Sequence, residues 1–309
     1  MDFFPLMVPV FAATLRMSFA LLIPSLGEAI SERSGVYNVG VEGYMLMGAI
    51  SSYLMAVTTG NLWLGIAAGM LGGAALSLVH AFLSVTLKTN QIISGIAIWL
   101  FSMGLSSFIF RTVGITDPIE GFAPIHIPVL SDLPGIGPII FHQNVLFYIA
   151  ILLVAIFAII MFRTRFGLIV KATGENPLAV DMAGYSVPKM RYLSILICGA
   201  MSGLGGAYLP LAVLHRFSEN ITAGRGFIAL CIVIFGGWNP WGILGGSMLF
   251  AFVDALQMQM QAAGVPVPFP LLLMLPYLIT IIVLVGVVGV IRKVAMPKKL
   301  AIPYIKGEA

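Results

Sequence analysis

The chain has 309 residues, of which 60% are hydrophobic and 9% are charged, and its formal net charge is +4. Because a soluble domain is roughly one quarter charged, this composition excludes a soluble globular protein. It predicts an all-α, polytopic membrane protein with a single transmembrane domain over residues 1–309.

Apolar runs recur along the whole chain, and each is a candidate membrane-spanning helix. They lie at about residues 7–30, 43–58, 62–86, 91–110, 144–162, 193–214, 226–237, 241–261 and 270–291. A span needs about 20 residues, so the short seventh run would cross about half of the bilayer core. We therefore expect about 8–10 transmembrane helices, some of them broken or re-entrant. The first run is too long, and its leader Met1-Asp2 too acidic, for a cleaved signal peptide.

Basic residues predict the orientation, because cytoplasmic loops are enriched in Lys and Arg. A polar loop at about 163–192 and a tail at about 292–309 are both basic, so we expect them in the cytoplasm, on the same side as Arg33 and Lys88. The connection at about 112–143 has five prolines and no Lys or Arg, so we expect it outside. An odd number of spans places the N-terminus outside, whereas a re-entrant seventh run would place it inside.

The external connection at 112–143 has two interpretations. Its prolines favour a shaped loop rather than a helix. It is either a linker between two halves of the protein or part of an outer surface on which a substrate-delivering protein sits.

The polar loop at 163–192 contains the pattern of a short helix. Asn176 is a favoured N-cap, Pro177 suits the first helical position, and Gly184 can end the helix in a left-handed conformation. The charged residues of the loop are mostly basic: Arg163, Arg165, Lys171, Lys189 and Arg191 against Glu175 and Asp181. A short helix outside the bilayer, between two spans, suits the docking of a partner protein.

Four stretches together resemble one known family. They are SERSGVYNVGVEGYMLMGA (Ser31–Ala49), TNQIISGIAI (Thr89–Ile98), RFGLIVKATGENPLAVDMAGYSV (Arg165–Val187) and GRGFIALCIVIFGGWNPWGILGG (Gly224–Gly246). In their content and order the chain resembles the permeases of bacterial ABC importers for branched-chain amino acids, simple sugars and nucleosides. The pattern Asn-x-Gly-x-Glu-Gly at Asn38–Gly43, with Gly174-Glu175-Asn176-Pro177, resembles the nucleoside type most. Trp99 departs from the family, where Asn is common.

The resemblance implies a function and a set of partners. The chain would be a permease subunit in the bacterial cytoplasmic membrane that forms a path for nucleosides. It would work with a second homologous permease, a cytoplasmic ATPase that uses ATP, and an extracytoplasmic substrate-binding lipoprotein. It would bind no nucleic acid, hold no cofactor of its own and not act as an enzyme. The residues implied to couple to the ATPase are Gly174, Glu175, Asn176, Pro177, Ala179, Ala183 and Gly184.

The sequence also indicates which polypeptide of such an importer hydrolyses ATP. The phosphate-binding pattern GxxxxGK[ST] does not occur in the chain, and neither does the dipeptide Gly-Lys. We therefore expect another polypeptide to hydrolyse ATP. The four histidines lack metal-ligand spacing and both cysteines lie in apolar runs, so we expect no metal site.

A path for a neutral, hydroxyl-rich ligand would combine amide and aromatic side chains with few full charges. The candidate residues are Tyr37, Asn38, Glu42, Asn90, Gln91, Trp99 and Asp254. Asn90 and Gln91 alternatively cap the helix that follows, and Glu42 alternatively caps a helix or bonds broken backbone. Asp254 shares a helix face with Gln257 and Gln261, which suggests a wet cavity or a subunit interface.

Several apolar runs contain further polar or small residues with structural meaning. Glu28 and Glu32 lie near the expected cytoplasmic end of the first run, so we expect water around them. Glycines recur at four-residue spacing at positions 65, 69 and 73, at 199 and 203, and at 242 and 246. This spacing predicts close helix packing, mostly within the subunit. A weak internal similarity nominates Asn38 and Asn239 as breaks between helices, although glycine-rich turns resemble one another equally.

Two other functions remain open on the sequence. A simple-sugar permease of the same family would need similar amide and aromatic groups. An ion-coupled secondary transporter would need an ionisable site inside the membrane, which Asp254 or Glu42 would supply.

Overall fold

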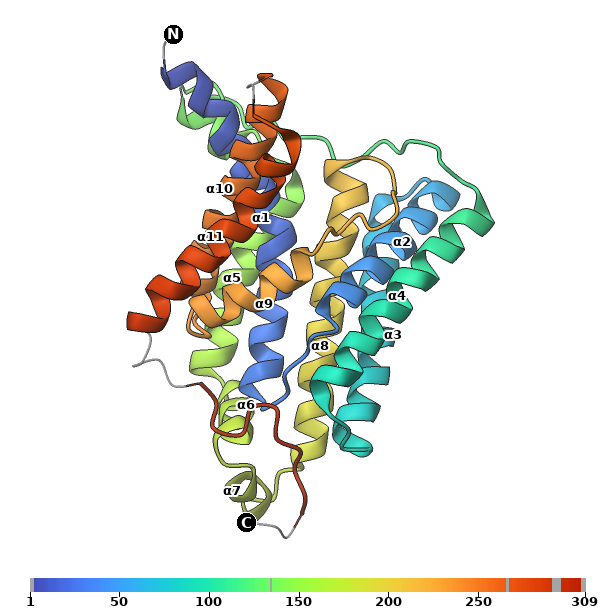
Figure 1. Ribbon diagram of the computed structural model, residues 1–309, viewed down its shortest axis with the longest axis vertical. Helices are drawn as coiled ribbons and strands as arrows, with labels where there is room; N and C mark the ends of the chain where they lie inside the picture. The colour runs from blue at the N-terminus through green and yellow to red at the C-terminus, as the bar shows by residue number, and fades with distance from the viewer. Residues whose placement is uncertain (1–2, 134, 265–266, 291–295, 307–309) are drawn as a thin grey trace.

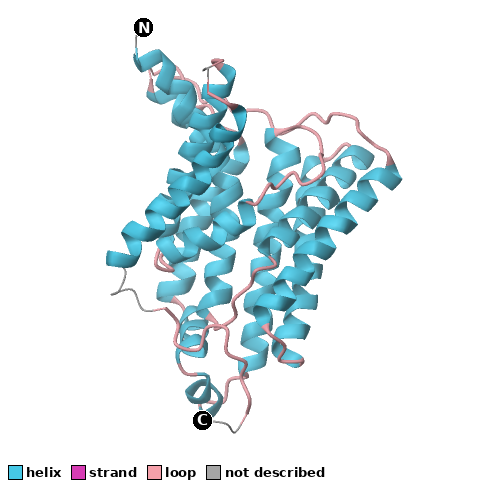
Figure 2. Ribbon diagram, in the orientation of Figure 1, coloured by secondary structure: helices cyan, strands magenta, loops and turns pink. Residues whose placement is uncertain are grey.

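The computed structural model describes residues 3–133, 135–264, 267–290 and 296–306. The regular elements of these residues are helices (Figure 2), which confirms the all-α prediction. The α-helices are α1 (Phe3–Arg33), α2 (Val41–Thr59), α3 (Leu62–Ala81), α4 (Gln91–Val113), α5 (Val145–Arg163), α6 (Arg165–Glu175), α7 (Pro177–Met182), α8 (Val187–Tyr208), α9 (Arg225–Phe235), α10 (Pro240–Ala262) and α11 (Phe269–Val290). Single π-helical turns are η1 (Phe82–Thr86), η2 (Gly137–Phe141) and η3 (Leu209–Val213).

Each of the nine apolar runs coincides with a helix of this bundle. By length and composition, six stretches of the described residues are able to cross a membrane, and they come from α1, α3 with η1, α4, α5, α8 with η3, and α10. The chain is therefore a multi-pass protein of the cell membrane. The helix of the seventh run, α9, has 11 residues and reaches about 16 Å at about 1.5 Å per residue. It is too short to cross a core of about 30 Å alone.

Two helices begin inside the bundle rather than at its end. Residues 34–40 lead from the end of α1 into the bundle, where α2 begins (Figure 1). Residues 214–224 likewise lead inward from the opposite end to the start of α9 (Figure 1). Each of these crossings therefore consists of an irregular segment followed by a helix.

The two ends of the bundle carry different segments. α1 begins at the end where residues 114–144 cross the top of the view, and α6, α7 and residues 296–306 lie at the other end (Figure 1). The second end contains the basic loop, so the positive-inside bias predicts that it is the cytoplasmic end. Arg292 and Lys293, at the start of the predicted tail, lie outside the described residues, as do Met1 and Asp2.

Glycines bring α2, α3 and α8 into close contact. A methyl group at Gly48 of α2 would overlap the backbone of Gly203 on α8, and one at Gly73 of α3 would overlap Gly199. Direct backbone contact of this kind strengthens helix association in a bilayer, where apolar surface gains nothing by leaving lipid. The regularly spaced glycines of these three helices therefore pack within the subunit.

Glu28 and Glu32 are fully buried, so the expectation that they face water was wrong. Donors from distant segments replace the water. The Asn38 amide and the Cys198 thiol donate to Glu28 at 3.0 and 3.1 Å. Trp238 Nε1 donates to Glu32 at 2.5 Å. The sequence of α1 alone could not show this burial, because the donors to Glu28 and to Glu32 lie in other segments of the chain.

Candidate functional site

The carboxylate of Glu42 joins the starts of α2 and α9. Glu42 lies in the first turn of α2 and is 1% exposed. Its Oε1 accepts from the Thr222 hydroxyl at 2.6 Å and from the Gly224 amide at 2.8 Å, and its Oε2 accepts from the Gly226 amide at 2.6 Å. A helix N-terminus has free amides and a positive dipole end. One carboxylate therefore stabilises two helix starts inside the membrane.

Close backbone packing accompanies this junction. A Cβ added at Gly226 would lie 2.5 Å from both the amide nitrogen and Cα of Glu42. No side chain fits at that distance, so glycine is required where α9 meets α2. Gly224, just before α9, has a φ of +81°, a conformation that also favours glycine.

Asn38 organises the irregular segment before α2. Its Oδ1 accepts from the Gly40 amide at 3.1 Å and from the Tyr44 hydroxyl at 3.0 Å. Its Nδ2 donates to the sulfur of Cys198 at 3.7 Å. Asn38 is fully buried, so it shapes the break instead of facing an open path. Asn239, the other nominated break, caps α10 by accepting from the Trp241 amide at 3.0 Å.

A cavity of about 430 Å³ adjoins the Glu42 junction. Trp99 of α4, Phe227 of α9 and Tyr277 of α11 contribute aromatic rings to its lining. Trp99 and Phe227 meet edge to face with their centroids 5.0 Å apart. Further lining residues are Glu42, Met103, Asn220, Ala223, Gly224, Ile228, Cys231 and Thr280. The structure thus brings two sequence candidates, Glu42 and Trp99, to one cavity.

A second cavity of about 510 Å³ lies along α4 toward its C-terminal end. It shares Met103 and Asn220 with the first cavity. Arg111 of α4 lines it and donates to both carboxylate oxygens of Glu219 at 2.8 and 2.9 Å. The two cavities are therefore neighbours that lead from the C-terminal end of α4 to the middle of the bundle.

The remaining sequence candidates lie outside the aromatic cavity. Asn90 caps α4 by accepting from the Ile92 and Ile93 amides, and Gln91 accepts from the Tyr37 amide at 2.9 Å. Asp254 pairs with Arg225 at 3.4 Å. Both of these side chains line a small cavity of about 160 Å³ beside α11, together with Gln257.

The predicted short helix in the polar loop is confirmed as α7. Asn176 accepts from the Ala179 amide at 3.1 Å, Pro177 is the first helical residue, and Gly184 follows the helix with a φ of +84°. Glu175 is the last residue of α6, and Gly174 packs on the backbone of Arg33. Ala179 and Ala183 lie within and just after α7, and Met182 at its tip is 82% exposed.

The tail at 296–306 bonds to both the polar loop and the first break. The Lys299 amide donates to the Gly174 carbonyl at 2.8 Å, and the Ala301 amide donates to the Gly35 carbonyl at 3.2 Å. Arg191 of α8, 1% exposed, donates to the carbonyls of Ser34 at 3.3 Å and Ile302 at 2.9 Å. The tail thus links the loop that carries α7 with the segment that leads into α2.

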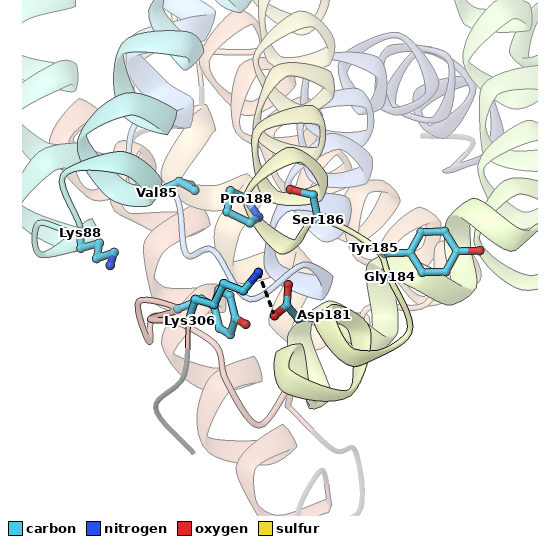
Figure 3. A pocket seen from close by; sticks show the side chains of 9 residues that line it. Val85, Lys88, Asp181, Gly184, Tyr185, Ser186, Pro188 and Lys306 are labelled. Carbon is cyan, nitrogen blue, oxygen red and sulfur yellow. Dashed lines mark ion pairs between the residues drawn. The ribbon is translucent and has the colours of Figure 1, made fainter.

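A cavity of about 480 Å³ separates α7 from the turn before α4. In Figure 3, Lys306 of the tail extends to Asp181 of α7, and Lys88 lies on the opposite side. The two charged groups of that pair are 3.8 Å apart. Loss of hydration and the Asp181 carboxylate raise the pKa of Tyr304, which also lines the cavity.

The sequence did not reveal several of these residues. Nothing in the sequence marked the site residues Phe227, Tyr277, Asn220 and Thr222, because they are ordinary residues of apolar runs or turns. Arg191 was counted only as a basic residue of the loop. A buried arginine joining two distant carbonyls requires the tertiary structure to be seen.

Comparisons with known proteins agree on one family. Residues 10–285 match the family model described as branched-chain amino acid transport system / permease component. The chain is 36% identical to the guanosine ABC transporter permease protein NupQ of Bacillus subtilis over the full length of both chains. It is 38% identical to the nucleoside ABC transporter permease protein NupC of Lactococcus lactis over 96% of each chain.

A relative that is named for a different substrate also matches. The chain is 41% identical to the putative glucose ABC transporter permease protein TsgC13 of Haloferax volcanii, over 80% of this chain and 76% of that protein. No solved structure matches the chain.

Proposed function

The chain belongs to the family of branched-chain amino acid transport system permease components, and from this premise we propose that it forms the path for nucleosides in an ABC importer. The observation that carries the proposal is the Glu42 junction, where two interrupted crossings meet beside an aromatic cavity. Interrupted helices at mid-membrane commonly flank substrate sites in transporters. The relatives that match nearly the whole chain are named for guanosine and nucleosides.

A simple-sugar permease is the second candidate, because one relative is named for glucose. That relative matches a smaller share of the chain than the nucleoside permeases do. Three aromatic rings around one cavity also favour a ligand with a flat aromatic face. Nucleosides are therefore the favoured substrate class.

The energy source in this proposal is a separate cytoplasmic ATPase, and the chain itself holds no cofactor. Met182, at the tip of α7, is 82% exposed, and Tyr185 just after it is 46% exposed. Large exposed apolar side chains on an otherwise polar segment suit a protein partner. Lys189 adds a basic group beside them, which complements an acidic surface. A second homologous permease and an extracytoplasmic binding lipoprotein complete the proposed importer.

A chain of contacts offers a route for the movement of α7 to reach the substrate path. The loop with α7 bonds to the tail at Gly174, and the tail bonds to Gly35 in the first break. That break continues to Glu42, whose carboxylate holds the start of α9. Docking of the ATPase would move α7, and packed contacts of this kind carry such a displacement. The two helix starts would then open the cavity alternately to each side.

The proposal is tested by substrate competition in cells. A strain that relies on this permease takes up labelled guanosine, and excess unlabelled nucleosides are added in parallel with excess glucose or ribose. Inhibition by nucleosides alone supports the proposal. Failure of this strain to take up labelled guanosine, together with uptake of labelled glucose or ribose that excess nucleosides do not inhibit, would assign the second candidate instead.

A further inference from the structure

The aromatic cavity has a definite architecture, with rings contributed by α4, α9 and α11. Phe227 is held edge to face against Trp99, so neither ring has to be ordered when a ligand enters. The phenol of Tyr277 lies near the start of α9, where its oxygen would be 3.5 Å from a Cβ on Gly224. The rings therefore form a preorganised surface at the junction of the two interrupted crossings.

The charged groups that line the two neighbouring cavities are already engaged by other groups of the protein. Glu42 borders it, but three donors occupy its carboxylate oxygens. In the neighbouring outer cavity, Arg111 is engaged by Glu219 through two hydrogen bonds. An ionic ligand would have to displace these bonds to reach either charged group, so the cavity suits a neutral molecule.

The polar groups that remain are few and fit the edge of a heteroaromatic ring. Asn220 belongs to both cavities and is exposed, with a left-handed φ of +54°. Its amide offers both donors and an acceptor. The volume of about 430 Å³ lies within the roughly 300–1,000 Å³ of pockets that hold small ligands.

We propose that this cavity binds the base of a transported nucleoside, with Trp99 and Phe227 as the stacking surface and Asn220 facing the polar edge of the base. The inference rests on the proposed function and goes beyond it by assigning recognition to the base instead of the sugar. Aromatic side chains stack on every base, so the site accepts purines and pyrimidines alike. Specificity for one base then depends on the edge contacts.

A native thiol allows a direct test. Cys231 lines the cavity and is partly exposed, whereas Cys198 is fully buried. The complete importer is reconstituted in vesicles and treated with N-ethylmaleimide, and modification of Cys231 is followed by mass spectrometry. Guanosine or uridine at about ten times its Kd should slow the modification about tenfold, because only about one tenth of the sites is then unoccupied. Ribose at the same concentration should leave the rate unchanged.

Variants separate base stacking from simple occlusion. Trp99→Leu should raise the KM for guanosine about tenfold and, at the same guanosine concentration, reduce the protection of Cys231 to about twofold. Trp99→Phe should keep most of the protection and a KM near that of the wild type. Trp241→Leu is the matched control, since Trp241 is 63% exposed at the start of α10 and lies outside the cavity lining. Cys231→Ser should remove the label, which assigns the signal to this residue.

The outcomes distinguish this proposal from the proposed function. ATP-driven guanosine uptake is measured in the same vesicles. If guanosine is transported but does not protect Cys231, or if Trp99→Leu keeps a normal KM, the base site is refuted while the function stands. Equal protection by ribose would show that the cavity recognises the sugar. If no nucleoside is transported, the proposed function itself fails.

Discussion

Glu42 Oε2 accepts a hydrogen bond of 2.6 Å from the backbone amide of Gly226. The two residues are far apart in the chain, yet each lies at the start of a helix that begins inside the bundle. In a bilayer, an unpaired amide costs several kcal/mol. The contact therefore allows both crossings to be interrupted at the same depth, where the aromatic cavity lies.

The Glu42 junction should fail when its acceptor is changed. In Glu42→Gln the side-chain NH2 group takes the place of one carboxylate oxygen, so at least one of the three buried donors loses its acceptor, at a cost of about 1–3 kcal/mol. We expect normal membrane insertion, a lower unfolding temperature in detergent and loss of most nucleoside uptake. Glu120→Gln, at an exposed position of the external loop, is the control. Wild-type uptake in Glu42→Gln would remove the carboxylate from the mechanism.

α7 should be the docking element for the ATPase. Gly184→Val forces a β-branched residue into a left-handed conformation at a cost of about 1–2 kcal/mol, with no other atom within 4 Å of the new Cβ. Gly114→Val is the matched control, because Gly114 has a φ of +66° with equally open surroundings at the other end of the bundle. Only Gly184→Val should reduce co-purification of the ATPase and ATP-driven uptake. An equal effect of both variants, or of neither, would contradict the assignment.

The tail should be held in place by Arg191. Arg191→Met removes donors from the carbonyls of Ser34 and Ile302, and hydrogen bonds from a charged group contribute about 1.5–3 kcal/mol each. Trypsin should then cleave at Lys298 and Lys299 about tenfold faster or more, and uptake should fall. Lys189→Met, at an exposed position of the same helix, should leave the tail protected. Unchanged cleavage in Arg191→Met would show that other contacts hold the tail.

The orientation can be checked with single cysteines in a variant that lacks Cys198 and Cys231. Ser186 lies at the end of the bundle with α7, and Asp132 lies in the connection at the opposite end, both exposed. An impermeant thiol reagent added to intact cells should label a cysteine at position 132 and spare one at 186. The reverse pattern would invert the topology.

The sequence predicted much of the fold because membrane spans have a strong local signal. Composition and apolar runs gave the helices, and the Asn176-Pro177 pair with Gly184 gave α7. The family resemblance, confirmed by the match over residues 10–285, gave the class of transporter. These features depend on residues that are close together in the chain.

The site could be predicted only in part, because its contacts join distant segments. Glu42 and Trp99 were nominated, but Phe227 and Tyr277 were not, since nothing in an apolar run marks which face lines a cavity. Asn220 was missed because it lies in the irregular segment between two runs, whose path the sequence does not show. Glu28 and Glu32 were expected near water, because the burial of a carboxylate depends on donors such as Trp238 that the helix itself does not contain. The docking of the tail on Arg191 was missed for the same reason.

The most direct test of the central claim is nucleoside uptake by the purified importer. The permease is reconstituted in vesicles with its ATPase and second permease, and binding protein loaded with labelled guanosine is added on the outer side. The account predicts guanosine accumulation when ATP is present on the ATPase side, and none with a non-hydrolysable analogue or with the ATPase omitted. Guanosine accumulation driven by a proton or sodium gradient without ATP would contradict it.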